Sequence, residues 1–251
     1  MSVCESELFE LCKKMRLSRN LAERAMEIDA CDNLDFLVKL FSEELAYRDA
    51  RRNEALVKAA GFYSVQTLEG YITDDIQFPP SAGLDELKAL SFIDDGWNVC
   101  MYGGTGTGKT MLSAALGFLA CKRGVPVKFF RTAALVNGLS EAQASGTLSK
   151  FLGKLEKAQV LILDEFGYVP VDRTGAQLLY DLVSEFYEKK KSIILNTNLE
   201  FSHWVNILYD QKMTAALIAR LLHRCHLLIF TGPDMRLKES SIHDMYAKIA
   251  G

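Results

Sequence analysis

The run from Val99 to Thr110, VCMYGGTGTGKT, has the clearest chemical signature in the chain. It holds the spacing Gly-x-x-x-x-Gly-Lys-Thr, which is typical of a phosphate-binding loop. Glycines let backbone N–H groups turn toward an anion, and the N-terminus of a following helix adds partial positive charge. The pattern predicts that Lys109 contacts the β- and γ-phosphates of ATP and that the Thr110 hydroxyl ligates Mg²⁺. The residues expected to bind the nucleotide are Gly103, Gly104, Thr105, Gly106, Thr107, Gly108, Lys109, Thr110 and Met111.

A second motif, Val160-Leu-Ile-Leu-Asp164-Glu165, is an apolar strand that ends in two carboxylates. Adjacent strand residues face opposite sides, but a chain that leaves the strand here can turn both carboxylates toward one site. We expect Asp164 to hold Mg²⁺ through water and Glu165 to orient and polarise the attacking water. The alternative is that the acidic pair only caps the next helix.

A third strand, beginning at Ile193, ends in the polar residues Asn196-Thr197-Asn198. An amide at this position can hydrogen-bond the γ-phosphate or the attacking water. Asn198 is the first candidate for this catalytic contact and Asn196 the second. The alternative is that Asn198 is an ordinary turn residue.

Two arginines near the end of the chain could also act on the nucleotide. Arg220 lies near the end of a helix before the last strand, where it could reach the nucleotide of a neighbouring subunit. An arginine supplied in this way accelerates hydrolysis by about 10³- to 10⁵-fold. The alternative for Arg220 is a surface ion pair. Arg236 is a candidate sensor of the γ-phosphate within the same chain.

The elements that must position these residues alternate between short apolar strands and helices. Such alternation predicts an α/β fold in which a parallel sheet is covered on both faces and binds ligands at the carboxyl ends of its strands. The expected strands are Asn98–Tyr102, Val125–Phe130, Val160–Leu163, Ile193–Thr197 and Leu227–Phe230. The expected helices are Asp85–Phe92 and residues 109–123, 132–143, 148–157, 174–190 and 213–223.

The first 60 residues show helical rather than alternating periodicity. Asp32-Asn33 resembles a helix start, and Gly61 a helix C-cap. Residues 61–83 contain Pro79 and Pro80 and are predicted to be a linker. We therefore expect a helical partner-binding or assembly module over residues 1–65 and the main domain over residues 66–251. The alternative is that the first helices are a packing extension of the main domain.

The 251 residues are 49% hydrophobic and 24% charged, with a formal net charge of −3, as expected of a globular protein with a buried core. Residues 120–157 nevertheless carry seven basic and two acidic residues, which indicates a surface that could bind nucleic acid, unless it is simply a solvated face. The sequence shows no signal peptide and no apolar run long enough to span a membrane, so a cytoplasmic location with reduced thiols is expected.

Several of these motifs together resemble the IstB family, the helper ATPases of bacterial insertion sequences. This family is related to the DnaC-type helicase loaders within the AAA+ superfamily. The resemblance covers nearly the whole chain, and the run from Asp164 to Arg173 is its most specific part. The motifs that carry it are Gly103–Thr110, Leu163–Pro170, Val171–Leu178, Asn196–Ser202 and Arg220–Arg224.

The resemblance implies an AAA+ P-loop NTPase with a five-stranded parallel sheet that binds ATP and Mg²⁺ and hydrolyses ATP to ADP. It implies a homo-oligomer with composite ATP sites that binds double-stranded DNA without strong sequence preference and stimulates a cognate transposase. By similarity, Asn198 is the first sensor, Arg220 the arginine finger and Arg236 the second sensor. A C-terminal helical lid is expected to be reduced or absent, since only about 20 residues follow the last strand.

The sequence departs from the family pattern at two places. Gly104-Thr105 stand where the family usually has two prolines, and little effect is expected because the loop uses backbone N–H groups. Ala219 precedes Arg220 where an acid is usual, so an orienting partner for the arginine is missing. The alternative function is a replicative helicase loader. A metabolic P-loop kinase would need a substrate-binding lid and an acceptor site, and neither is recognisable in the sequence.

Overall fold

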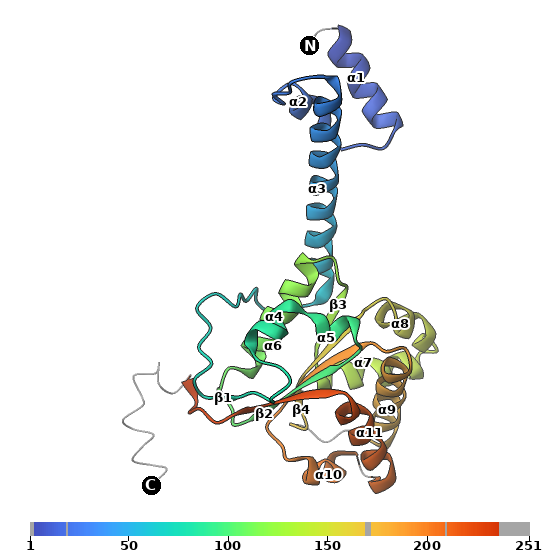
Figure 1. Ribbon diagram of the computed structural model, residues 1–251. Helices are drawn as coiled ribbons and strands as arrows, with labels where there is room; N and C mark the ends of the chain where they lie inside the picture. The colour runs from blue at the N-terminus through green and yellow to red at the C-terminus, as the bar shows by residue number, and fades with distance from the viewer. Residues whose placement is uncertain (1–2, 19, 169–171, 209, 236–251) are drawn as a thin grey trace, which may run out of the picture. The chain divides into compact units, whose positions relative to one another are not determined.

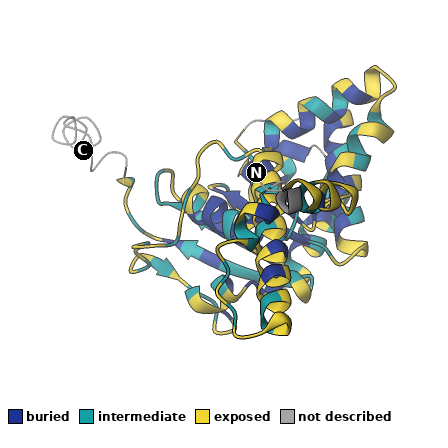
Figure 2. Ribbon diagram, turned by 90° about the horizontal axis from the view of Figure 1, so that it is seen from above, coloured by how far each residue is buried: buried dark blue, intermediate teal, exposed yellow. Residues whose placement is uncertain are grey.

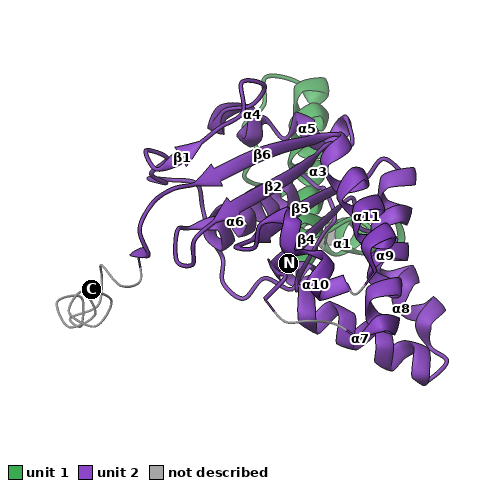
Figure 3. Ribbon diagram, turned by 90° about the horizontal axis from the view of Figure 1, so that it is seen from below, with its two compact units in different colours: residues 1–55 green, residues 56–251 purple. Residues whose placement is uncertain are grey.

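The computed structural model describes residues 3–18, 20–168, 172–208 and 210–235, with the side chains of residues 3–5 left out. The chain forms two compact units, residues 1–55 and 56–251, which are drawn in green and purple in Figure 3. None of the helices in these described ranges combines the length and apolar composition of a membrane span.

Unit 1 contains the helices α1 (Val3–Lys14) and α2 (Leu21–Ala25) and the first part of α3 (Asn33–Ala60). Its small core is built around the buried side chains of Cys12, Leu21 and Leu40. The Asp32 carboxylate accepts a hydrogen bond of 2.8 Å from the backbone N–H of Asp35, which confirms the helix start expected at Asp32-Asn33.

A buried carboxylate holds unit 1 together. Glu44 is only 3% exposed and lies 3.0 Å from Arg24 Nη2 and 3.3 Å from Arg48 Nε. It also accepts a hydrogen bond of 2.7 Å from the backbone N–H of Ser18. Burial acts to raise the pKa of Glu44, but the hydrogen bonds from Ser18 and Arg24 outweigh it, and the pKa is lowered overall. Glu44 therefore stays charged and fixes two arginines of this unit.

Unit 2 is built around a six-stranded sheet with the order β1-β6-β2-β5-β4-β3. Five parallel strands match the predicted ones: β2 (Asn98–Gly103), β3 (Val127–Arg131), β4 (Val160–Phe166), β5 (Ser192–Thr197) and β6 (Cys225–Phe230). The sheet has one strand more than the five expected. The additional strand, β1 (Ile76–Gln77), pairs antiparallel with β6 at the sheet edge. A two-residue strand inside the predicted linker is too short to produce a periodic pattern.

Helices cover the sheet on both faces, as predicted for continuous apolar strands (Figure 1). In Figure 2 these helices are blue on part of their circumference and yellow on the rest, as expected of amphipathic helices. The predicted helix over Asp85–Phe92 is instead two helices, because Leu90 adopts a left-handed backbone with φ of +64°. The helical segments of unit 2 after the end of α3 are α4 (Leu84–Ala89), α5 (Ser91–Asp94), α6 (Lys109–Lys122), α7 (Thr132–Ala144), α8 (Leu148–Leu155), α9 (Arg173–Glu188), the 3₁₀ turn η1 (Phe201–His203), α10 (Val205–Leu208) and α11 (Gln211–His223).

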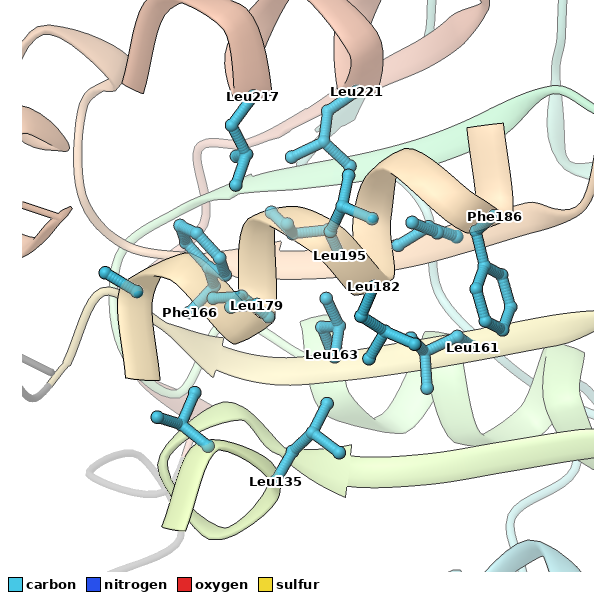
Figure 4. Close-up of a cluster of buried hydrophobic side chains, with 14 of the residues drawn as sticks. Leu135, Leu161, Leu163, Phe166, Leu179, Leu182, Phe186, Leu195, Leu217 and Leu221 are labelled. Atoms are coloured by element: carbon cyan, nitrogen blue, oxygen red, sulfur yellow. The ribbon is translucent and has the colours of Figure 1, made fainter. Parts of the chain in front are cut away.

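Unit 2 has two hydrophobic clusters in its described residues. The larger one lies between the sheet and helices α7, α9 and α11 (Figure 4). Helix α9 contributes Leu179, Leu182 and Phe186, which are at most 2% exposed. They pack with Leu161 and Leu163 of β4, which are fully buried. This core fixes β4, the strand that carries Asp164 and Glu165.

The compact units divide between Ala55 and Leu56, ten residues before the boundary expected from the sequence. The reason is that Leu56, Val57 and Ala60, from the last turns of α3, pack in the hydrophobic cluster of unit 2 that contains α6. Gly61 has a φ of +86° and follows the helix directly, which confirms the predicted C-cap. The expected reduction of the C-terminal lid concerns residues 236–251, which lie outside the described residues.

The core between α9 and β4 predicts a specific loss of stability. Leu182→Ala removes a side chain that is 2% exposed and leaves a cavity, so the free energy of unfolding should fall by about 2–5 kcal/mol. Gln177→Ala, on the exposed side of the same helix, should change it by less than about 0.5 kcal/mol. Urea denaturation followed by circular dichroism measures both, and equal effects would contradict the assignment of this core.

Candidate functional site

A cavity of about 500 Å³ lies at the carboxyl ends of β2, β4 and β5. This is the edge at which parallel α/β sheets bind ligands. It brings together the phosphate loop, the acidic pair and the polar end of the third strand. Its lining residues are Tyr63, Thr105, Gly106, Thr107, Gly108, Lys109, Thr110, Met111, Arg131, Asp164, Glu165, Tyr168, Asn196, Thr197 and Asn198.

The phosphate loop connects β2 to α6, as predicted, and depends on glycine for its path. Gly103 has a φ of +153°, and a Cβ there would lie 2.3 Å from the carbonyl oxygen of Phe230. The Lys109 ammonium donates hydrogen bonds of 2.8 and 2.5 Å to the carbonyl oxygens of Gly103 and Gly104. The Thr107 hydroxyl also donates to Gly104, over 2.9 Å. The loop is thus closed on itself with its lysine charge held at the cavity.

Tyr71, from the segment between α3 and α4, supports the phosphate loop from outside the motif. The Tyr71 hydroxyl donates a hydrogen bond of 3.2 Å to the carbonyl oxygen of Gly108. Burial raises the pKa of Tyr71 to about 12, so the hydroxyl keeps its proton at neutral pH. No sequence pattern predicts this contact, because the two residues are 37 positions apart and Tyr71 lies in the predicted linker.

Asp164 links several elements of the site. Its carboxylate is 4% exposed and accepts hydrogen bonds from the Thr110 hydroxyl, at 3.0 and 3.2 Å, and from Asn196 Nδ2, at 2.8 Å. Its backbone oxygen accepts a hydrogen bond of 2.9 Å from the Thr132 hydroxyl. The structure therefore brings together Thr110 and Asp164, the two residues predicted to serve a metal ion.

Glu165 reaches the same cavity by a different route from the one expected. The expectation was that the strand ends at Leu163, whereas β4 continues to Phe166 with a register shift between these two residues. Glu165 adopts a left-handed backbone with φ of +54°, a conformation that costs about 1–3 kcal/mol for a residue other than glycine. This bulge turns Glu165 so that two consecutive carboxylates line one cavity.

Asp164 and Glu165 do not cap the next helix, α9, so the alternative interpretation of this acidic pair is wrong. Asp172 occupies the N-cap of α9, and its carboxylate accepts a hydrogen bond of 2.8 Å from the backbone N–H of Gly175. Asp164 and Glu165 instead line the cavity.

Sequence reasoning missed four residues that line the cavity: Tyr63, Arg131, Tyr168 and Thr197. Arg131, the last residue of β3, lies with its Nε 3.5 Å from the Glu165 carboxylate, and its guanidinium stacks 4.8 Å from the centre of the Tyr63 ring. Arg131 could have been recognised, because it directly follows the strand predicted over Val125–Phe130 and so lies at the ligand edge. Tyr63 gave no signal, since it comes from the predicted linker.

The two candidate asparagines occupy different environments in the cavity wall. Asn198 is exposed and lines the cavity. Asn196 is 1% exposed, and its Nδ2 donates to Ser113 Oγ at 2.7 Å as well as to Asp164. The Asn196 Oδ1 atom is buried without a hydrogen-bond partner among the described residues. A buried acceptor of this kind requires a ligand, an ion or a water.

The two candidate arginines lie away from the cavity or beyond the described chain. Arg220, on α11, does not line the cavity; its Nη1 donates a hydrogen bond of 3.1 Å to the carbonyl oxygen of Ala216, and its guanidinium lies 5.0 Å from the centre of the Tyr180 ring. The alternative of a surface ion pair finds no partner carboxylate within the described ranges. Arg236 lies outside the described residues.

The oxygen atoms at the centre of the site fit a magnesium ion. The Thr110 hydroxyl, the Asp164 carboxylate and the orphaned Asn196 Oδ1 are all oxygen donors, the ligand type that Mg²⁺ prefers. Few protein oxygens are needed, because Mg²⁺ keeps several waters and binds substrate phosphates as well. The donor set is therefore compatible with Mg²⁺ bound beside a nucleotide.

The family model described as IstB-like ATP binding protein matches residues 10–243 of the chain. The ATP-binding protein of insertion sequence IS21 from Pseudomonas aeruginosa is 37% identical over 210 residues, which cover 82% of this chain and 77% of that protein. The corresponding protein of IS5376 from Geobacillus stearothermophilus is 32% identical over 249 residues, which cover 96% of this chain and 97% of that protein.

Solved structures share the fold of the main domain. AMPPCP-bound DnaA from Aquifex aeolicus has a TM-score of 0.53 and 22% identity, covering 68% of this chain and 52% of that one. DnaI has a TM-score of 0.53 and 19% identity, covering 73% of this chain and 98% of that one. This likeness shows that the domain carrying the phosphate loop shares the fold of these proteins.

Loss of the Lys109 charge predicts a loss of nucleotide affinity. A charge-assisted hydrogen bond contributes about 1.5–3 kcal/mol, so Lys109→Ala should raise the dissociation constant for ATP by about 10- to 150-fold. Lys122→Ala, at the far end of the same helix, should leave it unchanged. Isothermal titration calorimetry decides, and unchanged ATP affinity in the Lys109 variant would contradict the proposed placement of the phosphates.

Proposed function

The chain belongs to the family of IstB-like ATP-binding proteins and is an ATPase, and we propose that it is an ATP-dependent, DNA-binding regulator of transposition. In this proposal it assembles on target DNA and recruits and stimulates a cognate transposase. The observation that carries the proposal is the convergence of Lys109, Thr110, Asp164 and Glu165 in one cavity. The chain matches insertion-sequence ATP-binding proteins over most of its length.

The residues of the cavity supply the groups that ATP hydrolysis needs: phosphate ligands, metal ligands and a general base. Backbone N–H groups of the loop and the Lys109 ammonium bind the β- and γ-phosphates. Thr110 and Asp164 would hold Mg²⁺, and the ion would neutralise charge on the phosphates when bound. Glu165 accepts a proton from the water that attacks the γ-phosphorus, and the products are ADP and phosphate.

The asparagines at the end of β5 report the state of the γ-phosphate. Asn198 is the candidate for direct contact because it is exposed at the cavity wall. Asn196 is the second candidate, and its free Oδ1 supports a contact to a bound water beside Asp164. Arg236 is retained as a proposed contact to the γ-phosphate from the C-terminal segment.

We assign Arg220 to the nucleotide of a neighbouring subunit. It lies outside the cavity of its own chain and has no carboxylate partner in the described structure, so its charge is available to another molecule. An arginine supplied across an interface makes hydrolysis depend on assembly, with an effect of about 10³- to 10⁵-fold. The composite site explains why a homo-oligomer is part of the proposal.

Unit 1 is proposed to bind a partner or another copy of the chain. Helix α3 exposes apolar side chains at Leu34, Val38, Phe41 and Leu45, with exposed fractions of 72%, 58%, 48% and 62%. These residues alternate in spacings of four and three, so they follow one side of the helix. Exposed apolar surface of this kind marks an interaction site.

The pair formed by Arg131 and Glu165 predicts an effect on turnover. An exposed ion pair is worth about 0.2–1 kcal/mol, so Arg131→Ala should release Glu165 and raise basal ATP hydrolysis by at most about fivefold. ATP affinity should change by less than about twofold. Arg123→Ala is the control, since Arg123 bonds the carbonyl oxygen of Ala89 away from the cavity. A fall in turnover with weaker ATP binding would instead assign Arg131 to the nucleotide.

The mass of the particle tests the proposed function. Light scattering with ATP and a long nonspecific duplex should show a large, salt-sensitive complex that forms only when both are present.

Glu165→Gln should trap this complex because ATP is bound and not hydrolysed, and Arg220→Ala should slow hydrolysis without weakening ATP binding. If Glu165→Gln binds the duplex no better than the unmodified chain, hydrolysis does not reset the assembly. A monomer under every condition would favour the helicase-loader alternative, in which the partner supplies the ring.

A further inference from the structure

The structure separates the basic residues of the segment 120–157 into two groups. Four of them have contacts within the protein. Arg123 donates to the carbonyl oxygen of Ala89, and Lys128 donates to that of Ala59. Arg131 pairs with Glu165, and Lys122 lies 5.5 Å from the centre of the Phe118 ring. The charges of these four residues therefore take part in contacts within the fold or at the nucleotide site.

The second group is formed by Lys150, Lys154 and Lys157, which we call the α8 lysines. All three are exposed, and none of their ammonium groups pairs with a carboxylate in the described ranges. Lys150 and Lys154 lie on helix α8, and Lys157 lies in the turn that follows it. Their spacings of four and three place them along one side of the segment.

The opposite side of the segment is anchored to the protein. Leu155 is 2% exposed, and Leu148, Phe151 and Leu152 pack against the hydrophobic cluster beneath α7 and α9. The segment is therefore amphipathic, with its apolar side in the core and its lysines in solvent. A rigid support of this kind presents the three charges in a fixed row about 10 Å long, at 1.5 Å per residue.

The acidic residue nearest in sequence to the α8 lysines is already paired. Glu156 is the only acidic residue between Glu141 and Asp164, and its carboxylate lies 2.6 Å from Lys189 Nζ. The hydrogen bond from Lys189 lowers the pKa of Glu156, and Lys191 donates to the backbone oxygen of the same residue. Glu156 thus leaves the charges of the α8 lysines uncompensated. In unit 1, by contrast, Arg24 and Arg48 are paired with the buried Glu44.

The composition of the row indicates a phosphate backbone rather than a protein partner. Protein interfaces are enriched in aromatic residues, methionine and arginine and depleted in lysine, and they need an apolar anchor. No large apolar side chain of residues 148–157 is among the exposed ones. A lysine ammonium that contacts a phosphate positions the protein on the duplex and carries no sequence information.

We propose that the α8 lysines are the contact of this protein with the phosphodiester backbone of duplex DNA. A row of about 10 Å spans about three phosphates of one strand, which follow each other every 3.4 Å along the axis. This inference rests on the proposed DNA-binding function and adds its site. It accounts for binding without sequence preference, since each contact is to a phosphate.

The test compares two triple variants that lose the same charge. The first is Lys150→Gln, Lys154→Gln and Lys157→Gln. The control is Lys88→Gln, Lys122→Gln and Lys212→Gln, which changes lysines on α4, α6 and α11. Fluorescence anisotropy of a labelled nonspecific duplex, with ATP present, gives the affinity of each at several salt concentrations. ATP titration of both variants confirms that the nucleotide site is folded.

The α8 variant should reduce the slope of log affinity against log salt by about 2.7 per bound subunit, or about 0.9 for each lost phosphate contact. At 0.15 M salt this corresponds to a loss of affinity on the order of 100-fold. The control variant should retain most of the affinity and the slope.

Three results would overturn the inference: an unchanged slope in the α8 variant, an equal loss in the control, or a loss of affinity without a change in slope. If the unmodified chain binds no duplex at any salt concentration, the proposed DNA-binding function itself fails. The two failures are therefore distinguishable.

Discussion

The buried charge of Asp164 is the constraint on which the site depends. A carboxylate that is 4% exposed must be compensated by hydrogen bonds or by a cation, because an isolated charge in the interior is strongly unfavourable. Thr110 and Asn196 supply these bonds from the start of α6 and from β5. One carboxylate thereby ties together the phosphate loop and two strands, and it leaves the Asn196 oxygen open beside it. A cation at this position would complete the compensation.

Strain and pairing at Glu165 show how the fold adapts to function. A left-handed backbone at a glutamate is unfavourable, and it persists because the well-packed β4 and its neighbours fix the chain on both sides. The same bulge brings the carboxylate within 3.5 Å of Arg131. Arg131, which pairs with Glu165, immediately precedes α7, and α7 is followed by α8. The partner of Glu165 and the proposed DNA contact on α8 therefore lie close together in the sequence. The chain therefore runs directly from the cavity to the proposed DNA contact.

Charge has two distinct uses in this chain. In unit 1, Arg24 and Arg48 share Glu44, and in the main domain Arg123 and Lys128 bond backbone carbonyls. These groups are satisfied within the protein and contribute to its fold. The α8 lysines have no such partner in the described structure, and their charge is directed to solvent. Net charge, which is −3 for the whole chain, conceals this difference.

The sequence by itself determined the phosphate loop, the acidic pair, the alternation of strands and helices and the family to which the chain belongs. These features are local: consecutive residues fix the loop, and apolar periodicity fixes the elements. Only the tertiary structure decided that β1 adds a sixth strand, that Arg131 and Tyr63 join the cavity and that Asn196 bonds Asp164. It also decided which basic residues stay unpaired. Each of these depends on contacts between residues that are distant in the chain, and strand register and packing, which no local pattern specifies, bring them together.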